Sequence, residues 1–134
     1  MKLLRSPLAQ VRGLGSAKDG YEHWWMIKLT SVALIPLTVW FMIGLISLAG
    51  ASHAEVVQWV GHPFNGGMMV LFLLATFYHA ALGMQVIIED YVHDEAVKLA
   101  SILGVKFVLA LLAVISVVAV LRITLFAVMA DLGG

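Results

Sequence analysis

The sequence predicts an all-α integral membrane protein with three transmembrane helices. Hydrophobic residues make up 62% of the 134 residues and charged residues only 12%, whereas ordinary globular chains contain roughly 45–50% and about 25%. A water-soluble domain of this length could not bury so much apolar side-chain area, so the lipid bilayer is the expected solvent. Three apolar stretches each exceed the roughly 20 residues that a helix needs to cross a bilayer.

The expected spans cover about residues 29–51, 64–88 and 99–129 of a single membrane-anchor domain, residues 1–134. Pro36 lies inside the first span and predicts a kink. The third stretch contains Lys106 and Arg122, but the 15 residues between them are uncharged. Because both long side chains can snorkel to opposite membrane surfaces, we interpret this stretch as one span. Residues 52–63, between the first two spans, are expected to form a loop.

The basic residues predict the orientation of these spans. Lys98 lies in the second loop, whereas residues 52–63 and the tail after Arg122 contain no basic residue. Five basic residues precede the first span: Lys2, Arg5, Arg12, Lys18 and Lys28. The positive-inside rule therefore places the N-terminus and the second loop in the cytoplasm and the C-terminus in the periplasm. The first 28 residues contain no compact apolar core followed by a cleavage site, so a cleaved signal peptide is not expected.

Charge and cysteine content exclude some classes of partner and site. The net charge is zero, so no nucleic-acid partner is expected. Membrane lipid is an expected partner. The absence of cysteine excludes disulfides, thiolate metal sites and cysteine-ligated iron–sulfur clusters in this chain.

His79 is the only histidine deep within an expected span. It precedes Asp90 by 11 residues, or ~16 Å along a helix, which places it near the bilayer midplane. An ionisable side chain at that depth is costly and is a candidate functional group. Two interpretations remain open from the residues alone: a neutral imidazole hydrogen-bonded to a neighbouring helix, or an axial ligand of haem iron.

The helical period places Gly83 and Asp90 on the same face as His79. Gly83 leaves space one turn away for a flat macrocycle or a closely packed helix. The other two expected spans contain no histidine, and Met84 on the same helix cannot reach the opposite face of an iron. A bis-histidine haem would therefore need its second histidine from another polypeptide.

Asp90 and Tyr91 follow at the expected cytoplasmic end of the second span. A phenol at the membrane surface can donate a hydrogen bond to a quinone carbonyl, and a nearby carboxylate can orient it and relay protons. The alternatives are an interfacial aromatic residue for Tyr91 and solvated helix-end carboxylates for Glu89, Asp94 and Glu95.

The segment from Tyr78 to Val92 resembles the signature of the small hydrophobic membrane anchor subunit of succinate dehydrogenase, respiratory complex II. That pattern is a histidine, a glycine four residues on, and an aspartate–tyrosine pair eleven and twelve residues after the histidine. His79, Gly83, Asp90 and Tyr91 match it. Residues 20–30 are similar to the start of alphaproteobacterial members.

The resemblance implies a role for four residues. His79 corresponds to the axial haem b ligand, and hence to a ligand of the haem iron. Tyr91 corresponds to the tyrosine that contacts ubiquinone, and Asp90 to its neighbour in the quinone pocket. Lys28 lies where some relatives have an arginine near a haem propionate, although lysine lacks the bidentate fork. No catalytic residue for succinate is implied.

The implied function is that of a membrane anchor and electron-transfer subunit of succinate:ubiquinone oxidoreductase in the bacterial inner membrane. The implied partners are a flavoprotein subunit, an iron–sulfur subunit, and a second membrane anchor (cytochrome b) subunit that shares the haem b. Alternatives are a fumarate reductase membrane anchor, a cofactor-free structural membrane subunit, and a small transport protein that uses His79 as a proton relay.

Overall fold

The computed structural model describes residues 7–11 and 18–134, and within these ranges the chain forms helices and no strands. The helices are α1 (Pro7–Val11), α2 (Lys18–Ser47), α3 (His53–Gly61), α4 (Pro63–Tyr91) and α5 (Glu95–Gly133). Three segments are long and apolar enough to cross a membrane: Tyr21–Ser47, Pro63–Tyr91 and Glu95–Gly133. The predicted all-α fold with three membrane spans is confirmed.

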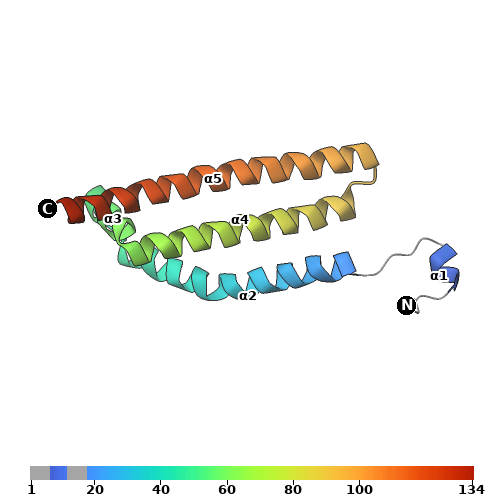
Figure 1. Cartoon of the computed structure of the whole chain (residues 1–134), viewed down its shortest axis with the longest axis horizontal. Helices are drawn as coiled ribbons and strands as arrows, with labels where there is room; N and C mark the ends of the chain where they lie inside the picture. The colour runs from blue at the N-terminus through green and yellow to red at the C-terminus, as the bar shows by residue number, and fades with distance from the viewer. Residues whose placement is uncertain (1–6, 12–17) are drawn as a thin grey trace.

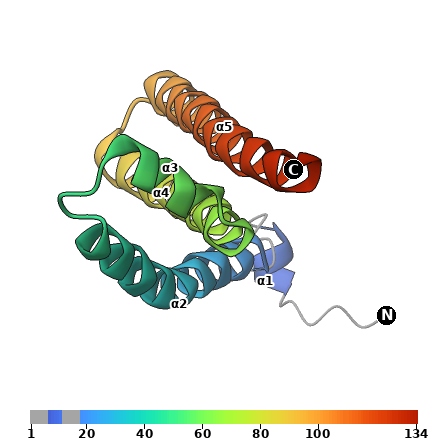
Figure 2. The same ribbon diagram turned by 90° about the vertical axis from the view of Figure 1, so that its left-hand side faces the viewer.

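The three long helices run antiparallel to their neighbours, with α4 between α2 and α5 (Figure 1 and Figure 2). Helix α4 packs against both, whereas α2 and α5 make no contact with each other in the part of the chain described. Figure 1 shows the start of α2 and the α4–α5 turn at one end of the bundle, and α3 and the C-terminus at the other. Among the described residues, Lys18 and Lys28 of α2 and Lys98 at the start of α5 therefore lie toward the same end.

The helices do not begin and end where the apolar stretches do. Helix α2 starts at Lys18 and ends at Ser47, whereas the expected span covered residues 29–51. The backbone of Gly50 has a φ of +79°, a conformation that favours glycine and redirects the chain after the helix. Helix α2 continues through Pro36, and Figure 1 shows the helix changing direction along its length.

The expectation of a loop at residues 52–63 is wrong, because most of this segment forms α3. A capping box starts the helix: the Ser52 N–H donates to Glu55 Oε2 at 2.6 Å, and the Glu55 N–H donates to Ser52 Oγ at 3.3 Å. The hydrogen bond from the Ser52 backbone, followed by that from its side chain, holds the pKa of Glu55 below its ordinary value. A serine followed three residues later by glutamate is a helix-start signal that the sequence analysis missed.

Helix α3 is held against the long helices by an aromatic stack and a hydrogen bond. The rings of Trp59 and Trp40 stack with centroids 5.5 Å apart. A Cβ added to Gly44 would lie 2.8 Å from Trp59 Cζ2, so this indole needs a glycine beneath it. The Thr124 hydroxyl of α5 contacts the Val60 carbonyl at 3.1 Å. Helix α3 therefore packs as an ordered cap across this end of the bundle.

Small residues bring α4 and α5 together, and an aromatic pair joins α2 and α4. A Cβ added to Gly66 would overlap Thr124 Oγ1 and lie 2.7 Å from its Cγ2, which is close packing of the small-residue kind found in membranes. The rings of Phe41 and Phe72 stack with centroids 4.7 Å apart. Few side chains are buried, and many large apolar ones remain exposed along all three spans. Such a surface suits contact with lipid and with other membrane helices.

Candidate functional site

His79 lies on the face of α4 that packs against α2, and it is hydrogen-bonded across that interface. Its Nδ1 atom lies 3.0 Å from the Thr30 Oγ1 atom of α2. Thr30 is buried, with only 9% of its surface exposed. One of the two ring nitrogens of His79 is therefore hydrogen-bonded to a neighbouring helix, as one of the two interpretations expected.

The His79 ring also lines an open groove of about 410 Å³ on the outside of the chain, called here the His79 groove. Its lining residues are Ser31, Leu34, Ile35, Thr38, Val39 and His79. No hydrogen-bond partner for the Nε2 atom of His79 occurs among the described residues. The groove has the volume of a small-molecule site, but one helix and one histidine cannot enclose it. A ligand held there would need a second surface to enclose it.

Gly83 leaves open space one turn from His79. Beyond its own turn of helix, a Cβ built at Gly83 would meet no atom of the described chain within 4 Å, so packing inside this chain does not require a glycine there. Met84 is exposed. Because it lies on the same helix as His79, it cannot reach the opposite face of an iron bound to that ring. An imidazole with one nitrogen engaged and one free, beside open space, fits one axial side of a haem.

Lys28 lies one turn before Ser31, on the stripe of α2 that continues into the His79 groove. Its ammonium lies 4.7 Å from the centroid of the Trp24 ring, a distance typical of a cation–π contact. The positive charge of Lys28 therefore lies near one end of the His79 groove. Lys28 makes no contact with His79 among the described residues.

Asp90 and Tyr91 end α4 and are both exposed, with 79% of Tyr91 accessible. Neither side chain makes a hydrogen bond within the described ranges. Tyr91 lies roughly 18 Å from His79 along the helix axis, since each residue adds about 1.5 Å. The chain by itself brings these two residues neither to His79 nor into a pocket.

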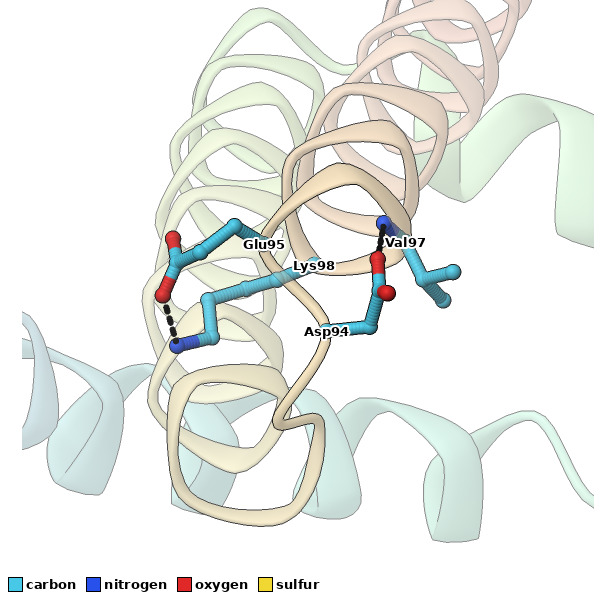
Figure 3. A network of polar contacts seen from close by, with 4 residues as sticks. All are labelled: Asp94, Glu95, Val97 and Lys98. Atoms are coloured by element: carbon cyan, nitrogen blue, oxygen red, sulfur yellow. Dashed lines mark hydrogen bonds and ion pairs between the residues drawn. The ribbon is translucent and has the colours of Figure 1, made fainter.

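The acidic residues after Tyr91 organise the turn into α5 (Figure 3). The Val97 N–H donates to Asp94 Oδ1 at 2.9 Å, so Asp94 caps the helix. Lys98 Nζ lies 3.3 Å from Glu95 Oε1. These contacts give Asp94 and Glu95 a structural role, and the exposed pair adds little stability.

Two residues at the depth of His79 received no role from the sequence patterns around it. Thr30 gave no signal, because a single hydroxyl in an apolar helix commonly bonds only to its own backbone. Lys106 lines a second groove, of about 220 Å³, together with Tyr78 and Ala81 of α4. It therefore lies at about the depth of His79, but on the α5 side of α4. No group of three or more histidine, aspartate or glutamate side chains that could hold a metal ion occurs in residues 7–11 and 18–134.

The known proteins that this chain resembles all belong to one family. Residues 2–114 match the succinate dehydrogenase/fumarate reductase transmembrane subunit family. The chain is 33% identical over 108 residues to the succinate dehydrogenase hydrophobic membrane anchor subunit of Paracoccus denitrificans, covering 81% of this chain and 84% of the relative. It is 28% identical over 116 residues to the protein of that name in Rickettsia bellii, covering 87% and 93%.

A third relative, the succinate dehydrogenase membrane anchor subunit of Reclinomonas americana, is 29% identical over 94 residues, covering 68% of this chain and 78% of the relative. No solved structure matches at a significant level. Because the family match takes in most of the chain and all of the first two spans, this protein belongs to the succinate dehydrogenase/fumarate reductase transmembrane subunit family.

Proposed function

We propose that this chain is a membrane anchor subunit of succinate:ubiquinone oxidoreductase, with His79 as one axial ligand of haem b. Family membership and the names of the relatives support the anchor role. The observation that carries the haem assignment is the position of His79: it lines an open groove with Nε2 unbonded within the described chain, next to the space beside Gly83. A bound haem would supply one-electron transfer, and the protein would supply its ligand and its surroundings.

The second axial ligand would come from another subunit. The four other histidines lie near the ends of helices: His23 early in α2, His53 and His62 at the two ends of α3, and His93 between α4 and α5. A second membrane anchor whose helix covers the His79 groove would both donate that ligand and enclose the haem. Lys28, at one end of the same stripe, would pair with a propionate.

Asp90 and Tyr91 would contribute one wall of the ubiquinone site. Their exposure at the end of α4 leaves the phenol and the carboxylate free to meet a partner subunit and a quinone. An iron–sulfur subunit docked at this end, together with the flavoprotein subunit that it connects, would deliver electrons from succinate close to Tyr91. The phenol would then donate to a quinone carbonyl as negative charge develops on it.

The chain is a multi-pass inner-membrane protein, and we propose that its N-terminus is cytoplasmic and its C-terminus periplasmic. The start of α2 and the α4–α5 turn share one end of the bundle (Figure 1), and the basic residues favour the cytoplasm for that end. Reporter fusions after Lys98 and after Gly134 should therefore report opposite sides of the membrane. Signals from the same side would contradict the three-span topology.

The haem assignment is tested by the spectrum of the purified, assembled complex. We expect a dithionite-reduced minus oxidised difference spectrum of a low-spin b-type haem, with one haem per flavin, because one histidine from each of two anchors makes one site. A complex that contains this chain and the flavin but no haem would support the cofactor-free structural subunit instead. Succinate-dependent reduction of added ubiquinone by the same preparation tests the assignment of the complex.

A further inference from the structure

We propose that Thr30 is a positioning residue that holds the His79 ring in the tautomer whose Nε2 is free to bind iron. This inference rests on the proposed role of His79 as a haem ligand. Thr30 lies on α2, outside the motif of α4 that contains His79, and the proposal gives it a role of its own.

The other partners of the Thr30 hydroxyl favour one direction for its hydrogen bond to His79. Oγ1 lies 2.8 Å from the Met26 carbonyl oxygen, 3.0 Å from that of Ile27, and 3.0 Å from His79 Nδ1. Both carbonyls can only accept, and the hydroxyl has a single proton, which it directs at them. With that proton on a carbonyl, Oγ1 accepts from Nδ1–H of His79, which is the direction that the proposed tautomer requires. A neutral imidazole with its proton on Nδ1 has its lone pair on Nε2.

The surroundings of this contact make it strong enough to orient a ring. Thr30 is only 9% exposed, so solvent has little access to its hydroxyl. Hydrogen bonds are electrostatically stronger in such a low-dielectric interior. The contact also joins α2 to α4, whose packing is further held by the Phe41–Phe72 stack. The ring plane of His79 is therefore set by tertiary structure.

An acceptor at Nδ1–H also raises the basicity of the imidazole toward a metal, and loss of such partners typically weakens metal affinity 10- to 100-fold. A more basic ligand favours the ferric over the ferrous iron. Thr30 would therefore make the haem harder to remove and lower its reduction potential.

The test compares three variants of the complete complex: Thr30→Val, which removes the hydroxyl and keeps the shape; Thr30→Ser, which keeps the hydroxyl; and Thr76→Val. The Thr76 hydroxyl is buried on α4, one turn from His79, and has no partner in the described chain, so Thr76→Val is the matched control. The readouts are the haem midpoint potential, and the rate of haem transfer to excess apomyoglobin.

For Thr30→Val we expect a more positive midpoint potential and haem loss faster by roughly tenfold or more. Thr30→Ser and Thr76→Val should both resemble wild type. If Thr30→Val fails to assemble, Thr30→Ala, which removes the hydroxyl without adding bulk, takes its place in the comparison. Wild-type potential and haem loss in the hydroxyl-free variant would overturn the proposal, and so would equal changes in Thr76→Val.

The His79→Ala complex separates this failure from failure of the proposed function. If His79→Ala alters the haem spectrum while the Thr30 variants resemble wild type, only the positioning role of Thr30 is lost. If His79→Ala leaves the low-spin spectrum unchanged, His79 is not a ligand and both proposals fall.

Discussion

Replacing His79 by alanine should abolish the low-spin, bis-histidine spectrum of haem b in the assembled complex. The iron would lose one strong axial donor, and Met84 cannot replace it because it lies on the same helix. Loss of the haem or a high-spin spectrum, with water or a weak donor in the vacant position, would both fit this expectation. Optical and electron paramagnetic resonance spectra of the purified complex measure the change.

The chain offers a matched control in His93→Ala. His93 is exposed in the turn between α4 and α5, outside both helices and fourteen residues after His79, so its replacement should leave the haem spectrum as in wild type. The amount of flavoprotein that co-purifies with each variant shows whether the anchor still assembles. An unchanged low-spin spectrum in an assembled His79→Ala complex would exclude ligation by His79.

Replacing Tyr91 by phenylalanine should slow ubiquinone reduction much more than succinate oxidation with a soluble artificial acceptor. Phenylalanine retains the ring and deletes only the hydroxyl, so the variant isolates the hydrogen bond. A donor directed at charge that develops in a low-dielectric site is worth roughly 3 kcal/mol, or about a hundredfold in rate. Because 79% of Tyr91 is exposed in this chain, partial solvation reduces the expected effect to about tenfold.

The ratio of the two activities, compared with wild type, is the deciding quantity. Tyr78→Phe is the matched control, since Tyr78 is on the same helix but lines the groove toward α5, away from the expected quinone site. Both variants lose one phenolic hydroxyl from α4. If the ratio in Tyr91→Phe stays at the wild-type value, Tyr91 is an interfacial aromatic residue and the quinone assignment fails.

The sequence predicted those features of the fold that depend on local composition and on distances along one helix. Three apolar stretches were enough to indicate three spans, because a bilayer requires about 20 apolar residues for each crossing helix. The common face of His79, Gly83 and Asp90 follows from the helical period alone. Helix α3 was also predictable, since Ser52 and Glu55 form a capping box, but its nine residues are too few for a span and therefore indicated a loop between spans.

What the tertiary structure decided is how each span is rotated and which helix lies beside it. The spans are apolar around most of their circumference, so their patterns do not show which face turns inward. Only the packed bundle shows that Thr30 meets His79 across 49 residues of sequence, and that Lys106 lies beside Tyr78 on the other side of α4. The sequence by itself placed a histidine deep within an expected span. The packing of α2 against α4 decided that its Nδ1 atom faces Thr30, because only a neighbouring helix can bring a polar partner to a ring in the middle of a span.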